Sequence, residues 1–284
     1  MGLVSVAEIL ADAKARSYAV GAFNLNNMEI LQAIIGAAEA ERSPVILQAS
    51  QGGIAYAGLE YIAAMAKVAA EKATVPVALN LDHGTSFEQA VRCIRHGFSA
   101  VMIDGSHHPY SENVSICQRV VAAAHAVGVS VEGGLGRIGG TEDDISVDEK
   151  DAMLADPNEV VSFVAETDVD CLAVAIGTAH GVYHGEPKLD FERLAKIRSL
   201  VEIPLVLHGA SGVSDEDIKQ AIARGICKIN IDTELRQAFS GAVRGELAAD
   251  PSQIDPRKLL GPARSAMEEV VREKLRLFGS SQKA

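Results

Sequence analysis

Three histidines follow short apolar runs of the chain directly: His83 in LDHG, His180 in GTAHG and His208 in HGASG. Taken singly, each is more readily explained as a hydrogen-bonded structural side chain than as a ligand. If the fold brings them together, protonated imidazoles would repel one another, whereas a divalent metal would hold them neutral. We therefore predict a catalytic zinc or related site at these three residues. His107 is a competing ligand that the spacing alone leaves open.

Asp82 comes immediately before His83, at the end of the apolar run PVALNLDHG. A carboxyl group beside a metal ligand suits a general acid or base at a reacting hydroxyl. The same group could instead orient a metal-bound imidazole by hydrogen bonding to it. The sequence leaves both roles of Asp82 open.

Two later segments, HGASG (208–212) and NIDTE (230–234), indicate a phosphate site. Their small residues, hydroxyls and backbone amides are typical of phosphate-binding loops, and a helix that begins after 230–234 would favour an anion at its N-terminus. The alternative is that Ser, Thr and Asp merely cap helices there. A metal beside a phosphate predicts a phosphorylated substrate whose carbonyl or hydroxyl lies near the metal.

The elements that must position these residues are eight short β-branched runs, each followed by a longer segment with helical periodicity. This alternation predicts an α/β fold, a (β/α)8 TIM barrel. A doubly wound sheet is the alternative, but no GxGxxG follows the first strand, and the glycine-rich segment 133–140 is predicted to be a loop. The predicted strands span 18–23, 44–49, 76–81, 99–104, 128–132, 170–176, 204–208 and 226–231.

In such a barrel the chemistry lies at the C-terminal ends of the strands. Every predicted strand here delivers a polar side chain to that rim, so the candidate residues are expected to converge. In chain order these side chains are Asn24, Ser50, Asp82, Asp104, Glu132, His180, His208 and Asn230.

The composition argues against a nucleic-acid-binding protein and against a membrane-spanning one. The 284 residues carry a net charge of −12 without a block of Lys or Arg, which argues against nucleic acid as a partner. No apolar stretch is long enough to cross a membrane, and the four scattered cysteines fit a reduced, cytoplasmic protein. We expect one TIM-barrel domain over 1–284, with a C-terminal helical extension at about 255–279.

Several long motifs, in this order, resemble the class II, metal-dependent ketose-bisphosphate aldolases. They are LDHG, VMIDGSHHPYSENV, AVAIGTAHGVY, LVLHGASG and KINIDTE, and the likeness covers nearly the whole chain. The resemblance implies reversible cleavage of fructose 1,6-bisphosphate to dihydroxyacetone phosphate and glyceraldehyde 3-phosphate through a zinc-stabilised enediolate. It also implies one Zn²⁺ per subunit, with Co²⁺ or another divalent ion as an alternative, and it allows a monovalent cation.

The same resemblance assigns roles to individual residues. His83, His180 and His208 match the zinc ligands, Asp82 the proton donor, and Glu142 a mobile-loop carboxylate that acts at C3. Ser50 and Arg257 match positions linked to the second phosphate, the arginine coming from a neighbouring subunit of a homodimer or homotetramer. The predicted substrate contacts are Asn24, Ser50, Gly181, Gly209, Ala210, Ser211, Asn230, Ile231, Asp232, Thr233 and Arg257.

One residue departs from the family pattern. Gly134, in VEGGLG, stands where the family usually has a glutamate that offers an alternative metal ligand alongside Asp104. The three-histidine set is intact, so metal binding is still expected. The departure leaves open a non-catalytic phosphosugar-binding accessory subunit, and a tagatose 1,6-bisphosphate aldolase is a further alternative. A metal-dependent hydrolase lacks support, because the first strand is followed by FNLNN in place of an HxH pair.

Overall fold

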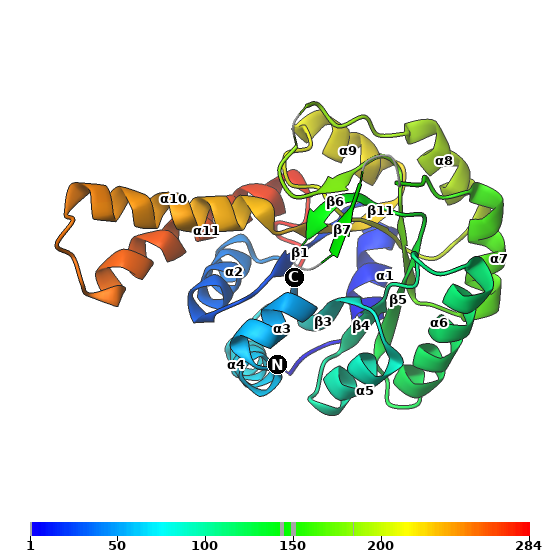
Figure 1. Cartoon of the computed structure of the whole chain (residues 1–284), viewed down its shortest axis with the longest axis horizontal. Helices are drawn as coiled ribbons and strands as arrows, with labels where there is room; N and C mark the ends of the chain where they lie inside the picture. The colour runs from blue at the N-terminus through cyan, green and yellow to red at the C-terminus, as the bar shows by residue number, and fades with distance from the viewer. Residues whose placement is uncertain (1, 143–144, 149–151, 184) are drawn as a thin grey trace.

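The computed structural model describes residues 2–142, 145–148, 152–183 and 185–284. Within this part of the chain, eight parallel strands close into a barrel in the order β1-β11-β10-β8-β5-β4-β3-β2. Figure 1 shows the whole chain. Each strand overlaps a predicted range, so the (β/α)8 barrel is confirmed. The strands are β1 (Val20–Asn24), β2 (Val45–Ser50), β3 (Val77–Gly84), β4 (Ala100–Ile103), β5 (Ser130–Leu135), β8 (Cys171–Val174), β10 (Leu205–Leu207) and β11 (Ile226–Ile231).

Helices surround the barrel (Figure 1). One apolar core contains residues of both these helices and the strands. A second, inner core fills the barrel, and α1 (Val6–Arg16) packs into it with Val6, Ile9 and Leu10. Polar caps start many of the outer helices; Ser86, for example, accepts from the Gln89 amide at 3.2 Å. These helices are α2 (Met28–Glu41), α3 (Gln51–Ala57), α4 (Leu59–Lys72), α5 (Phe87–Arg95), α6 (Tyr110–His125), α7 (Pro157–Thr167), α8 (Phe191–Leu200) and α9 (Asp215–Ala223).

The glycine-rich segment 133–140 is not simply the loop that its composition predicts. β5 continues to Leu135, and β6 (Gly139–Glu142) begins a small second sheet with β7 (Ile145–Val147) and β9 (Ala179–His180). The prediction is wrong at its ends because pairing with β8 and β9 satisfies the backbone there. Gly133 also has to be small, since a Cβ would lie 2.9 Å from the Phe163 ring. The second sheet places His180 at the barrel mouth.

The last two helices, α10 (Thr233–Ala249) and α11 (Pro256–Leu277), form a hairpin that projects from the barrel (Figure 1). We call this hairpin the helical arm. The inner part of α11 packs against α2, where Arg272 and Arg276 both contact Glu41. The predicted C-terminal helix at 255–279 is thus confirmed as α11, and the single domain over 1–284 stays a prediction. No helix in the described residues has the length and apolarity to cross a membrane.

Candidate active site

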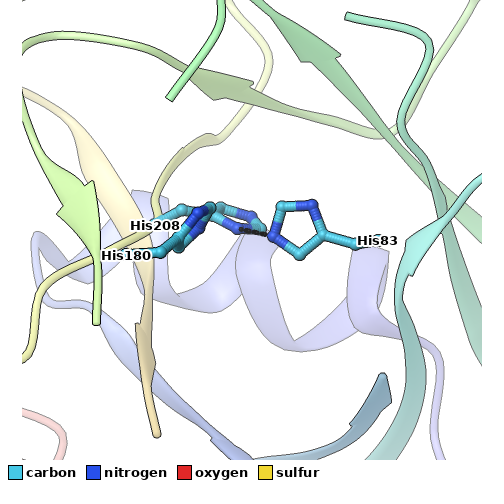
Figure 2. Close-up of side chains that lie close together, drawn as sticks. All are labelled: His83, His180 and His208. Carbon is cyan, nitrogen blue, oxygen red and sulfur yellow. Dashed lines mark hydrogen bonds between the residues drawn. The ribbon is translucent and has the colours of Figure 1, made fainter. Parts of the chain in front are cut away.

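The structure brings His83, His180 and His208 together at the C-terminal end of the barrel. One nitrogen from each ring lies within 4.8 Å of the others, and in the described residues these three side chains form the group able to hold a metal ion. Figure 2 shows the His83 ring facing the other two. The centroid of the His83 ring is 5.0 Å from that of His180 and 4.7 Å from that of His208. His83 and His208 are buried, and His180 is partly buried. His107, the competing ligand in the sequence, is exposed and lies outside this group.

A local irregularity in β3 allows Asp82 and His83 to serve the same site. Consecutive residues of a regular strand point to opposite faces of the sheet. Here the pairing with β4 shifts register between Leu81 and Gly84, and His83 has φ of 49°, in the left-handed region. Such a backbone is rare for a residue other than glycine and is often found at functional sites. Both side chains are consequently buried at the barrel mouth.

Buried carboxylates fix the proton positions on two of the three rings. His83 Nδ1 lies 2.8 Å from Asp104 Oδ2, and His208 Nε2 lies 2.7 Å from Glu132 Oε1. Burial alone would raise the pKa of Asp104, but hydrogen bonds from His83 and Ser106 hold it well below its usual range. Burial also opposes ionisation of Glu132, yet nearby Lys228 and His208 lower its pKa to about 2. Both carboxylates are ionised, so each imidazole is the donor.

The remaining nitrogens of these two rings face each other. His83 Nε2 and His208 Nδ1 are 3.0 Å apart (Figure 2), and both carry a lone pair when the outer nitrogens hold the protons. Two facing lone pairs repel unless a cation or a shared proton lies between or beside them. The donor set therefore fits a divalent metal such as zinc, for which neutral imidazole nitrogen is a preferred ligand.

Asp82 is held by amide donors from three barrel strands. Its Oδ2 accepts from Asn24 at 2.9 Å and from Gln48 at 3.2 Å, and its Oδ1 accepts from Asn230 at 3.3 Å. Asn230 also contacts His208 at 3.2 Å, so it links the carboxylate to the three histidines. Gln48 is absent from the sequence-based list of site residues. The signal that could have found it is a glutamine inside the apolar run PVILQAS.

A cavity beside His180 gathers most of the predicted phosphate contacts. α10 begins at Thr233 on its edge, so the amide end of a 17-residue helix is directed at the site. Arg236 also lines the cavity and pairs with Asp232 at 2.6 Å. This arginine is a cation that the sequence analysis overlooked, although its four-residue spacing from Asp232 is a recognisable pattern. The cavity is lined by Thr141, Ala179, His180, Gly181, Gly209, Ser211, Asn230, Asp232, Thr233 and Arg236.

The other predicted contacts lie in different surroundings. Ser50 pairs with Asp82 across β2 and β3, and its hydroxyl caps α3 by accepting from Gly53 at 3.1 Å. Ala210 and Ile231 are buried in the outer core. Glu142 belongs to β6 by its backbone, but its side chain is outside the described residues.

Arg257 is not brought to the barrel mouth of its own chain. It is the second residue of α11, which begins at the outer end of the helical arm (Figure 1). Its side chain is 90% exposed and pairs with Asp255 at 2.8 Å. Any role of Arg257 in substrate binding therefore requires a second copy of the chain.

Gly134 lies beside the Asp104 carboxylate. A Cβ at this position would be 3.4 Å from Asp104 Oδ1 and 3.4 Å from Met102 Cε, which is ordinary van der Waals contact. The backbone does not require glycine here, since no positive φ is found at Gly134. The surroundings of Gly134 therefore leave room for a Cβ.

Comparison with known proteins agrees with this geometry. Residues 4–283 match the family model described as fructose-bisphosphate aldolase class-II. The chain is 52% identical to a fructose-bisphosphate aldolase of Geobacillus stearothermophilus, over 100% of this chain and 99% of the relative. It is 50% identical to a fructose-bisphosphate aldolase of Thermus caldophilus, over 99% of this chain and 100% of the relative.

A solved structure shows the same architecture. The crystal structure of the YdjI aldolase from Escherichia coli K12 superposes with a TM-score of 0.88 at 38% sequence identity, covering 99% of both chains. The family match extends over almost all the residues, and the relatives match from end to end. The chain belongs to the fructose-bisphosphate aldolase class-II family.

Proposed function

We propose that this protein cleaves fructose 1,6-bisphosphate reversibly to dihydroxyacetone phosphate and glyceraldehyde 3-phosphate, as a metal-dependent carbon–carbon lyase. The observation that carries the proposal is the placement of Asp82 and three converging histidines at the mouth of one barrel. The family of the chain and the names of its relatives support the same reaction. The proposed substrate has a phosphate at each end, and the cavity at the start of α10 suits one of them.

His83, His180 and His208 would hold the divalent ion, with Zn²⁺ as the preferred metal and Co²⁺ as an alternative. When bound, such an ion supplies positive charge that polarises a carbonyl and stabilises a neighbouring enediolate. Asp104 has a separate role in this proposal, because its oxygens already accept from His83 and from the Ser106 amide. Asp104 orients His83 by accepting its hydrogen bond. Asp82 is therefore not needed to orient this metal ligand.

Asp82 would act as the acid and base. In cleavage its carboxylate takes the proton from the C4 hydroxyl while the C3–C4 bond breaks, and the electron pair stays on the C3 fragment. In the synthetic direction it returns that proton to the aldehyde oxygen. The amide donors of Asn24, Gln48 and Asn230 hold the carboxylate in one orientation before substrate binds. Proton transfer at C3 falls to Glu142 in this proposal.

Substrate contacts would come from the cavity and its loops. Gly181 and Gly209 line the cavity, and both have positive φ, a backbone conformation that favours residues without a side chain. Ser211, Asn230, Asp232 and Thr233 line the cavity beside them and would add polar contacts. Ser50, which pairs with Asp82 across β2 and β3, would contact the second phosphate. A monovalent cation is compatible with the proposal. The four buried, free cysteines support a reduced, cytoplasmic location.

A homodimer or homotetramer would complete the site with Arg257. Support comes from the helical arm, whose outer end carries both Arg257 and the 90% exposed Ile254. Mixing two inactive variants, Asp82→Ala and Arg257→Ala, tests this arrangement. Turnover returns if the arginine acts across subunits, because a mixed dimer has one intact site. Turnover stays lost if each arginine serves its own chain.

The experiment that tests the substrate is a comparison of kcat/KM for fructose and tagatose 1,6-bisphosphate under identical conditions. The two sugars differ only in configuration at C4, the carbon whose hydroxyl faces Asp82 in this proposal. We expect the higher kcat/KM for fructose 1,6-bisphosphate. A higher value for the tagatose sugar would reassign the substrate within the same mechanism.

A further inference from the structure

Lys228 is a fully buried lysine inside the barrel. β11 pairs with β1 so that Lys228 lies beside Val20, a member of the inner core. Its Nζ is 2.7 Å from Glu132 Oε2, and both side chains are almost completely excluded from solvent. Lysine is rarely buried unless it is paired, so this ion pair requires an explanation.

The partner of Lys228 also contacts the histidine group. The second oxygen of Glu132 accepts from His208 Nε2 at 2.7 Å, which makes a continuous chain from Lys228 through Glu132 to His208. The other nitrogen of the ring, Nδ1, faces His83. Lys228 is therefore two side chains away from the candidate metal site.

Stability alone does not account for the pair. Removing two charges from water is unfavourable, and well-packed apolar residues of similar volume are often as stabilising as a buried ion pair, or more so. The inner core around it is otherwise built from small and apolar residues such as Ala173 and Val206. The carboxylate of Glu132 can accept a hydrogen bond from His208 and so orient its ring, which an apolar side chain could not do.

We propose that Lys228 and Glu132 are positioning residues for the metal site. The Lys228 ammonium holds the Glu132 carboxylate in place, and the carboxylate keeps the His208 proton on Nε2. The Nδ1 nitrogen of His208 then carries a lone pair that can bind the metal. This inference rests on the metal site proposed above, and it predicts that Lys228 acts on metal affinity only through Glu132.

Three variants and a control test the proposal. Glu132→Gln keeps the shape and removes the charge, Lys228→Met removes the ammonium, and the double variant removes both charges together. Cys227→Ala changes a buried neighbour of Lys228 in the inner core whose thiol bonds to Gly225 O, outside the chain of contacts. Circular dichroism of each metal-free protein checks folding. Each single variant leaves one buried charge without its partner, whereas the double variant leaves none, so the double variant is informative even if either single variant fails to fold.

Zinc affinity, measured by competition with a chelator, is the first readout. We expect Glu132→Gln to weaken zinc binding by about 10- to 100-fold. Adding Lys228→Met to Glu132→Gln should change the affinity by no more than about twofold, because the carboxylate through which the lysine acts is already gone. Cys227→Ala should bind zinc as the wild type does. Unchanged affinity in folded Glu132→Gln, or a further large loss in the double variant, would overturn the proposal.

The position of the His208 proton is the second readout, and a purely structural role would not change it. Nitrogen NMR of metal-free, histidine-labelled protein should show a proton on Nε2 in the wild type. Glu132→Gln should add a form protonated on Nδ1, because an amide can donate as well as accept. A single unchanged tautomer in that variant contradicts the proposal. Wild-type protein that binds no zinc overturns the metal site itself, whereas wild-type binding with unaffected variants overturns only the role of Lys228 and Glu132.

Discussion

His83 Nε2 and His208 Nδ1 face each other across 3.0 Å, and the opposite nitrogen of each ring donates to a buried carboxylate. The two carboxylates, Asp104 and Glu132, lie behind the rings and direct both lone pairs to the same point. Metal sites commonly use such carboxylate–histidine pairs to orient their ligands. This arrangement predicts how substitutions in the site should change metal binding and turnover.

The wild-type protein should bind one divalent ion per chain, and His83→Ala should lose it. Removing this imidazole leaves two ligands, too few for a stable zinc site. Metal content after dialysis, measured by mass spectrometry, checks the prediction. His107→Ala is the matched control, since that histidine is exposed and lies outside the group. Metal retained in His83→Ala but lost in His107→Ala would reverse the ligand assignment.

Asp82→Ala should keep the metal and lose turnover by about 10²- to 10⁴-fold, the usual contribution of a general acid or base. The reason is that Asp104 orients His83, so the metal ligand does not depend on Asp82. Metal analysis and steady-state kinetics on the same preparation separate the two effects. Loss of the metal together with turnover would instead assign Asp82 to orienting the ligand.

The wild type should be active with glycine at position 134, and Gly134→Glu should change kcat by less than about tenfold, or about 1.4 kcal/mol of barrier. The space beside Asp104 accepts a Cβ in ordinary contact, and Asp82 and the three histidines are in place without it. Kinetics on both proteins decide the point. Activity that rises from near zero in the variant would favour the accessory-subunit alternative.

The stability of the folded protein should depend on pH through Glu41, which lies where the helical arm packs against α2. Hydrogen bonds from Arg276 and Arg272 lower the pKa of this carboxyl below its usual value of 4.5, although burial opposes them. A carboxyl group whose pKa is lower in the folded state stabilises the protein at any pH above its unfolded-state pKa. That stabilisation is lost as the pH falls through the folded-state pKa. Glu41→Gln should therefore lower the melting temperature by a few degrees at pH 7.

Melting curves between pH 7 and pH 3 measure this dependence. The difference between wild type and Glu41→Gln should shrink below pH 4.5. Glu269→Gln is the control, because Glu269 contacts the same two arginines at 3.6 and 3.8 Å but is more than half exposed. A difference that stays constant over the whole pH range would contradict the linkage.

The barrel and the convergence of its strand ends were predictable from the sequence. Alternating apolar and amphipathic segments are a local pattern, and parallel strands bring their carboxyl ends together by topology. The shift of register that turns His83 beside Asp82 was not predictable, because it arises from the pairing of β3 with β4. The same is true of β6, β7 and β9, short strands that pair with one another in the second sheet.

The hydrogen-bond partners of Asp82 and Glu132 inside the barrel were also not predictable from the sequence. Gln48 and Lys228 are single polar residues in apolar runs, and only the closed barrel shows that one faces Asp82 and the other Glu132. Arg257 illustrates the opposite case, since a single chain leaves it exposed on the helical arm. Contacts that depend on register, or on a second copy, leave no periodic signal in the sequence.

The most direct test of the account is the cleavage of fructose 1,6-bisphosphate by purified protein before and after chelation of its metal. Triose phosphate formation, followed with a coupled dehydrogenase added after the chelator is removed, should be lost in the metal-free protein and should return when zinc is added. That result would tie turnover to the site formed by His83, His180 and His208. Full turnover by protein shown to contain no metal would mean that cleavage does not depend on a bound ion.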